Sequence, residues 1–218
     1  MVILDRDKKI IREIDRWRVC QGRHIKELTG FSGQRACDRR LSKLIEAGYI
    51  KREKILYGVA GIYRNTSKAT RIVEEQLYGV NRKIKIEQIM HDIVILDTAI
   101  AFNKMYGIGF DTMKTDIELH RLDGFGLRKH RPDFVYNQDG KTICVEIELS
   151  LKSKVRFENI IKDNFLEYDK QIWVVPKLEN KITKVLNDNM TAYPNIEILE
   201  LAEIKKVIES DNNVDTEQ

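Results

Sequence analysis

The chain has 218 residues, of which 33% are charged and 42% hydrophobic, and its formal net charge is +4. These values are typical of a soluble globular protein with one large or two small domains. Because the net charge is small, any contact with nucleic acid must come from local clusters of basic residues rather than from a global field.

Neither a membrane span nor a disulfide framework is expected. No apolar run approaches the roughly 18 residues of a membrane helix, and the first residues lack the apolar stretch of a signal peptide. The three cysteines, Cys20, Cys37 and Cys144, are scattered without CxxC spacing. We therefore expect a cytoplasmic protein with no membrane partner and no structural zinc site.

Three helices are predicted at the start of the chain. Apolar residues recur at helical spacing over residues 8–19. A second helix covers residues 24–30 and is stopped by its final glycine. Ser32 is placed to cap a third helix, which ends at Gly48.

A β-hairpin is predicted next. Residues 49–52 begin a strand, and residues 55–64 form a hairpin with a glycine-bounded tip. Three helices followed by a β-hairpin predict a winged helix-turn-helix. A connecting helix running to about Tyr78 completes this first domain, which we place at residues 1–79.

The predicted recognition helix and wing carry most of the basic residues of this domain. Arg35, Arg39 and Lys43 recur at i, i+4 and i+8. A cationic stripe on the second helix of a helix-turn-helix suits phosphates and guanine edges in the major groove of duplex DNA. A solvated helix face and a protein-binding winged helix are the alternatives. The predicted DNA-contacting residues are Gln34, Arg35, Arg39, Arg40, Lys43, Lys51, Arg52 and Arg64.

The second domain is predicted over residues 80–209, followed by a disordered polar tail at 210–218. It opens with a core helix over residues 82–105, on which His91 lies. A lone histidine on such a helix is more often a packed residue than a catalyst. A strand region through His120 follows, and then a flexible basic loop ending at His130.

The hairpin over residues 133–148 is the most informative segment. Asp139-Gly140 predicts a type I′ turn, which places Asp133 opposite Glu146, with Glu148 two residues further on the same face. Opposed like charges destabilise a sheet, so the three carboxylates predict a hard divalent cation among them. The alternative is an ordinary half-exposed strand whose glutamates face water.

The remaining residues alternate between helices and strands. A helix with several lysines and an arginine is predicted at 152–168, a strand at 171–175, a helix at 177–190, a strand at 196–199 and a last helix at 201–208. The second domain is therefore predicted to have an α/β arrangement. Its order is helix, three antiparallel strands, helix, strand, helix, strand and helix.

This order resembles the restriction-endonuclease fold of the PD-(D/E)xK nuclease superfamily. The matching residues are Pro132-Asp133 and Glu146-Ile147-Glu148. The resemblance implies that Asp133 and Glu146 bind Mg²⁺ or Mn²⁺. Glu148 stands where the motif usually has lysine, and it would serve as a further ligand or orient the attacking water. Lys152 or Lys154 would then supply the missing cation.

The order of motifs along the chain is also similar to the replication-relaxation family of plasmids and other mobile elements. These motifs are a winged helix, the His91-Asp92 pair, Arg131-Pro132-Asp133 and Val145 to Glu148. That family is similar to the MOB-C class of conjugative relaxases. The resemblance implies binding of plasmid DNA near a transfer or replication origin, with relaxosome or replication proteins, or a second copy, as partners.

Two functions of different classes follow. The first is a metal-dependent DNA endonuclease or nickase, with Asp133, Glu146 and Glu148 at the metal, His91 as a proton carrier and Lys152 as the added cation. The second is a non-catalytic accessory protein or transcriptional regulator, which binds DNA through the winged helix and keeps the nuclease fold as a scaffold.

Overall fold

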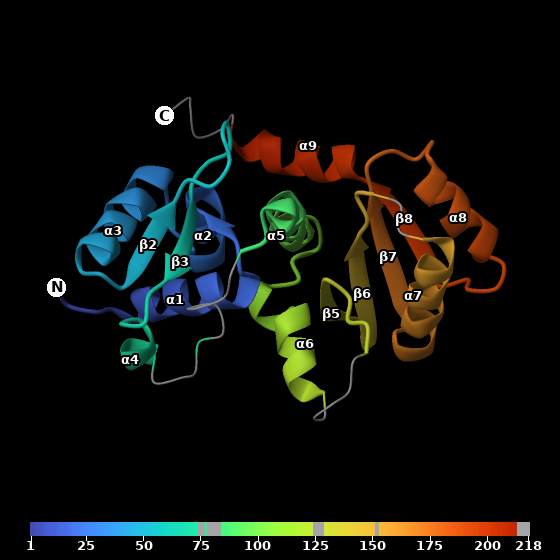
Figure 1. The fold of residues 1–218 in the computed structure, drawn as a ribbon, viewed down its shortest axis with the longest axis horizontal. Helices are drawn as coiled ribbons and strands as arrows, with labels where there is room; N and C mark the ends of the chain where they lie inside the picture. The colour runs from blue at the N-terminus through green and yellow to red at the C-terminus, as the bar shows by residue number, and fades with distance from the viewer. Residues whose placement is uncertain (74–76, 78–83, 124–128, 151–152, 213–218) are drawn as a thin grey trace. The chain divides into compact units, whose positions relative to one another are not determined.

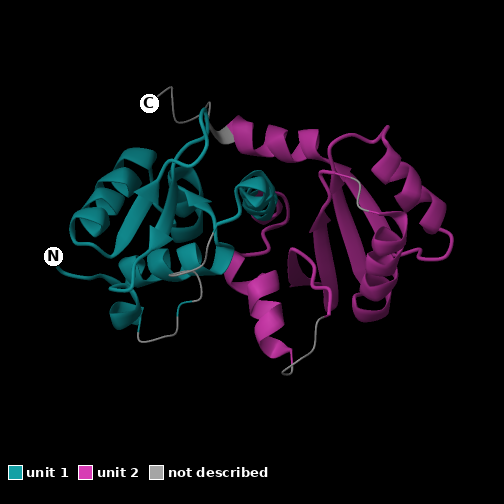
Figure 2. Ribbon diagram, viewed as in Figure 1, with its two compact units in different colours: residues 1–100 teal, residues 101–218 magenta. Residues whose placement is uncertain are grey.

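The computed structural model describes residues 1–73, 77, 84–123, 129–150 and 153–212. It is a mixed α and β protein, as the sequence predicted, and divides into unit 1, Met1–Ile100, and unit 2, Ala101–Gln218 (Figure 2). The division falls within the long helix α5, Ile86–Tyr106. The boundary predicted between residues 79 and 80 lies outside the described residues.

Unit 1 combines helices with a small antiparallel sheet of strand order β1-β3-β2 (Figure 1). Besides the first part of α5, its elements are α1 (Asp5–Trp17), β1 (Cys20–Gln21), α2 (Gly22–Thr29), α3 (Gln34–Glu46), β2 (Ile50–Glu53), β3 (Ile62–Asn65) and α4 (Thr70–Val73). The predicted connecting helix is therefore described only as α4, because most of the residues after it lie outside the described ranges.

The helix ends of unit 1 follow the sequence signals only in part, since α1 covers Asp5–Trp17 where residues 8–19 were predicted. Gly30 ends α2 in the left-handed region, with φ of 65°, as glycine readily does. Ser32 does not cap α3, and that prediction was wrong. Gly33 is the N-cap instead, in extended conformation, and its carbonyl oxygen accepts hydrogen bonds from the amides of Ala36 and Cys37, both at 3.2 Å.

The buried imidazole of His24 joins α2 to the first part of α5. The amide of Gln21 donates to His24 Nδ1 at 3.2 Å, so Nε2 carries the ring proton and donates to Asp97 Oδ1 at 3.0 Å. Arg23 also binds Asp97, with Nη2 at 2.9 Å from Oδ2. The His24 side chain is fully buried, and this burial lowers its pKa below the ordinary 6.5, a shift that the Asp97 hydrogen bond only partly offsets.

Unit 2 is built on a five-stranded sheet of order β4-β5-β6-β7-β8. The pairs β4–β5 and β5–β6 are antiparallel, and β6–β7 and β7–β8 are parallel, which agrees with the predicted order of strands and crossover helices. Besides the end of α5, its elements are η1 (Phe110–Thr112), β4 (Lys114–Thr115), α6 (Asp116–Leu122), β5 (Phe134–Gln138), β6 (Lys141–Ile147), α7 (Lys154–Glu167), β7 (Lys170–Val175), α8 (Lys181–Asn189), β8 (Ile196–Glu200) and α9 (Leu201–Asn212).

Two segments of unit 2 differ from the prediction. The region before His120 is a strand only at β4 and then becomes the helix α6. Thr115 and Glu118 form a capping box there, in which the Thr115 amide donates to Glu118 Oε2 at 2.8 Å. At the other end, α9 continues to Asn212, so residues 210–212 are helical rather than part of a disordered tail. Residues 213–218 lie outside the described ranges.

Both faces of the central strands are covered. On one face Phe102, from the end of α5, meets Phe134 and Tyr136 edge-on, with ring centroids 6.0 and 6.1 Å apart. On the other face lie α7 and α8 (Figure 1), and Phe157 of α7 packs against Trp173 of β7 at 4.9 Å. No helix in the described ranges is long and apolar enough to cross a membrane.

The burial of His24 predicts a pH dependence of stability. Its pKa is lower in the native state than in the unfolded chain, so the unfolded chain binds the proton more readily. The free energy of unfolding should therefore fall as the pH drops below 6.5, by at most about 1.4 kcal/mol per pH unit for one proton. Urea denaturation at pH 7.5 and pH 5.5 measures this loss.

His24→Gln should reduce the fall in the free energy of unfolding between pH 7.5 and pH 5.5. His91→Gln is the matched control, because His91 is a partly exposed histidine of α5. An equal pH dependence in wild type and His24→Gln would contradict this role of the buried histidine.

Candidate functional sites

The outer face of α3 carries a row of exposed cations. Cys37, Leu41 and Leu44 are buried against the rest of unit 1 and fix which face of the helix points inward. Arg35, Arg39 and Lys43 are then exposed on the outer side, as their spacing predicted. Within the described ranges no ion pair neutralises these three side chains. We refer to them below as the α3 row.

Gln34 and Arg40, also predicted to contact DNA, are engaged within the protein. Gln34 Nε2 donates to Asp38 Oδ1 at 2.8 Å. Arg40 Nε donates to Asp7 Oδ1 at 2.6 Å, its Nη2 also binds Asp7, and its Nη2 donates to the Val2 carbonyl at 3.0 Å. Asp7 is 0% exposed, and its carboxylate raises the pKa of Arg40. Arg40 therefore neutralises a buried charge and ties α3 to α1.

The predicted wing has a mixed charge distribution. Lys51 Nζ is 2.5 Å and Arg64 Nη1 3.5 Å from the Glu53 carboxylate, so two predicted DNA contacts are paired. Arg52 is exposed, and its guanidinium lies 5.8 Å from the centre of the Tyr63 ring. Tyr57, between the two strands, is 100% exposed. Of the predicted DNA contacts on this hairpin, Arg52 is the exposed cation that forms no ion pair with the described residues, and the Tyr57 ring is exposed beside the strands.

The register of the acidic hairpin agrees with the prediction. Asp139 and Gly140 have φ of 50° and 75°, as a type I′ turn requires, and Phe134 pairs with Val145. β5 begins at Phe134, so Asp133 precedes the strand. Its Oδ2 accepts a hydrogen bond from the Ile147 amide of β6 at 2.7 Å.

The glutamates of this hairpin are buried, so the alternative that they face water is wrong. Glu146 and Glu148 are each 3% exposed, because α7 covers their face of the sheet. Glu146 Oε1 lies 2.6 Å from His130 Nε2 and accepts from Asn164 Nδ2 of α7 at 2.9 Å. The sequence prediction did not find these two partners. The one available signal was the position of His130 directly before Arg131-Pro132-Asp133.

A network of ion pairs fixes the segment between His130 and β5. Arg131 binds Asp123, and its Nη1 is 2.5 Å from Glu167 at the end of α7. Lys129 Nζ is 2.5 Å from the other oxygen of Glu167. Hydrogen bonding to Asp123 raises the pKa of Arg131, and in turn the pKa of Asp123 is lowered. The segment that carries His130 is therefore held to α6 and α7.

The other predicted site residues are not gathered at the hairpin. His91 belongs to unit 1, where its Nδ1 is 4.0 Å from Asp92. Lys154 is exposed, 3.7 Å from Glu158, and Lys152 lies outside the described residues. Asp133, Glu146 and Glu148 have the hard oxygen donors that Mg²⁺ prefers. In the described part of the chain, however, no three His, Cys, Asp or Glu side chains are grouped so as to hold a metal ion.

No protein-family model matches the chain, and no curated protein matches it at a significant level.

The Arg40–Asp7 pair predicts a large effect on stability. Arg40→Ala leaves the buried carboxylate of Asp7 without its cation, which costs about 3–5 kcal/mol for a buried pair. Arg39→Ala is the matched control on the same helix, and its exposed side chain predicts a change within about 0.5 kcal/mol. Urea denaturation of the two variants measures the difference, and equal stabilities would show that Arg40 is not a structural cation.

Proposed function

We propose that this chain binds duplex DNA, with unit 1 as a winged helix-turn-helix, α3 as its recognition helix and the β2–β3 hairpin as its wing. The order of the three helices and the strand order β1-β3-β2 support this assignment. The observation that carries it is the α3 row. Arginines and a lysine that are exposed and not neutralised are available to phosphates and base edges.

The dimensions of the row suit the major groove. Arg35 and Lys43 are eight residues apart, which corresponds to about 12 Å along a helix. The major groove of B-DNA is about 12 Å wide and admits one α-helix. A helix lying in it brings a row of this length against several successive phosphates and base edges. Basic residues that are already bound inside the protein, such as Arg40, are not needed for the contact.

The test removes two charges from the α3 row. The double variant Arg35→Ala with Arg39→Ala should bind duplex DNA at least tenfold more weakly. It should also lower the slope of log affinity against log salt concentration, by about 0.9 for each phosphate that the protein no longer neutralises. Lys205→Ala with Lys206→Ala, on the exposed side of α9, removes the same net charge and should change neither quantity. Fluorescence anisotropy over a range of salt measures both. Equal behaviour of the two double variants would refute the proposal.

A nuclease activity of unit 2 is the second candidate function. Its support is the sheet order, three antiparallel strands continued by parallel ones, together with Asp133, Glu146 and Glu148 on the β5–β6 hairpin. This agrees with the proposed restriction-endonuclease-like fold. A bound Mg²⁺ would activate water and stabilise charge on the phosphate, and Asp133 and Glu146 are the residues that would hold it. The proposed DNA is that of a plasmid or other mobile element, on the strength of the motif order.

Thermal melts and plasmid nicking test this second candidate. Glu146→Gln should lower the melting temperature in EDTA, since the neutral amide weakens the contact with His130, a loss of about 1.5–3 kcal/mol for a hydrogen bond to a charged group. If the carboxylates bind metal, Mn²⁺ should stabilise the wild type by mass action but not Asp133→Asn. Metal-dependent nicking of supercoiled plasmid should be lost in the same variant.

Asp139→Asn is the matched control for the acidic hairpin. It makes the same Asp-to-Asn change at the turn, where asparagine tolerates the positive φ. A wild type that neither responds to millimolar Mn²⁺ nor nicks plasmid would leave an accessory DNA-binding protein with a nuclease-like scaffold.

A further inference from the structure

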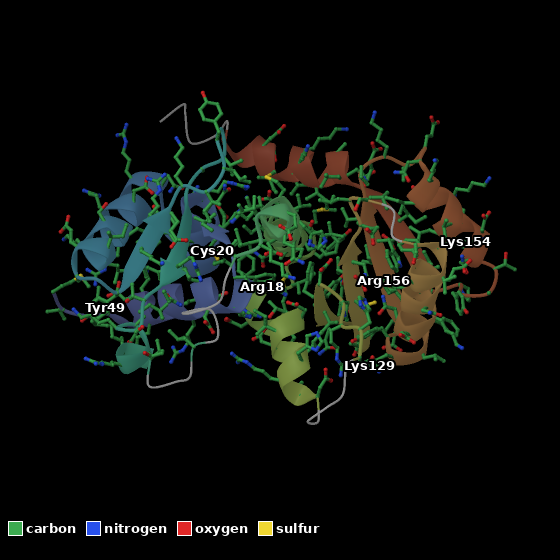
Figure 3. All side chains as sticks on the ribbon, in the orientation of Figure 1. Arg18, Cys20, Tyr49, Lys129, Lys154 and Arg156 are labelled. Carbon is green, nitrogen blue, oxygen red and sulfur yellow. The ribbon has the colours of Figure 1, made fainter. Side chains whose placement is uncertain are left out.

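Unit 2 has a cavity of about 640 Å³ beside the ion pairs of Lys129 and Arg131. Three segments contribute to it, namely α6, the residues directly before β5, and α7 with its N-cap residue. Its charged and titratable lining consists of His120, Lys129, His130, Arg131, Arg156 and Asp163. Figure 3 labels two of these side chains, Lys129 before β5 and Arg156 on α7. Three permanent cations and one carboxylate therefore surround this space.

The cations of the cavity differ in how they are held. Lys129 and Arg131 share the Glu167 carboxylate, and Arg131 also binds Asp123, so both are fixed in place. Arg156 is exposed on α7 and forms no ion pair with the residues that the structure describes. A guanidinium with uncommitted donors binds phosphate bidentately, and fixed neighbouring cations reduce the ordering cost of such binding.

The cavity is adjacent to the acidic hairpin. His130 lines it, and the same ring lies 2.6 Å from Glu146 Oε1. Asn159 of α7 lies in the wall of the cavity, and Asn164 of the same helix binds Glu146. A phosphate held in the cavity would therefore lie one side chain away from the buried carboxylate.

We propose that this cavity binds a backbone phosphate of a DNA strand, as a second nucleic-acid contact that is separate from the α3 row. The exposed Arg156 guanidinium, beside the fixed cations Lys129 and Arg131, suits a phosphate. That the phosphate belongs to DNA rests on the proposed function of unit 1. Val155 lies at the wall and is 69% exposed, so it offers an apolar surface to the sugar beside the phosphate.

The experiment measures binding of a labelled 12-nucleotide single strand by fluorescence anisotropy. The full chain with Arg35→Ala and Arg39→Ala is the background, because this removes two of the three cations of the α3 row. Adding Arg156→Ala should weaken the single-strand affinity about three- to tenfold and lower the salt slope by about 0.7, the value for one phosphate contact on a single strand. Adding Arg156→Lys should restore part of the affinity.

Lys162→Ala is the matched control. Lys162 is an exposed cation of the same helix that does not line the cavity, so its removal should leave affinity and slope unchanged. Arg156 is exposed, and melting temperatures should be equal in all variants. Equal effects of Arg156→Ala and Lys162→Ala, whether both absent or both present, would overturn the proposal.

The two proposals fail in different ways. Duplex affinity that does not respond to Arg35→Ala with Arg39→Ala refutes DNA binding by α3 and leaves the single-strand result to judge the cavity. Single-strand affinity that does not respond to Arg156→Ala refutes the cavity and leaves the duplex result to judge α3.

Discussion

The buried carboxylate of Glu146 is the constraint on which the arrangement of unit 2 depends. A charge removed from water costs several kcal/mol unless other groups compensate it. Here the compensation comes from His130, before β5, and from Asn164, on α7. One side chain on β6 thereby fixes both the segment that leads into the hairpin and the helix that covers the sheet. These two segments, together with α6, also form the cationic cavity.

Unit 1 uses buried carboxylates in a similar way. Asp7 requires Arg40, and Asp97 requires Arg23 and His24. Arg40 and Arg23 thereby pair with acids and hold helices together, whereas the α3 row remains exposed. Sequence position alone does not distinguish Arg39 from Arg40, although the first faces solvent and the second a fully buried carboxylate.

The features that the sequence predicted well are those set by neighbouring residues. The type I′ turn at Asp139-Gly140 fixed the hairpin register, and the spacing of apolar residues fixed the exposed face of α3. The missed helix α6 also had a local signal, the Thr115–Glu118 capping box. The partners of Glu146 were not predictable in this way, since they lie 16 and 18 residues away and depend on how α7 packs on the sheet. The Arg40–Asp7 pair, separated by 33 residues, has the same origin.

The contacts of Glu146 also bear on the choice between a nuclease and a scaffold. Both hydrogen bonds end on the same oxygen, Oε1, so an ion that took this atom would replace a histidine and an amide contact. The free energy of those contacts opposes metal binding, and the observed affinity is lowered by the cost of breaking them. A phosphate in the neighbouring cavity changes this balance, because it offers His130 a second negative partner. On the nuclease hypothesis, metal and DNA would then bind cooperatively at this hairpin, whereas a scaffold needs no such coupling.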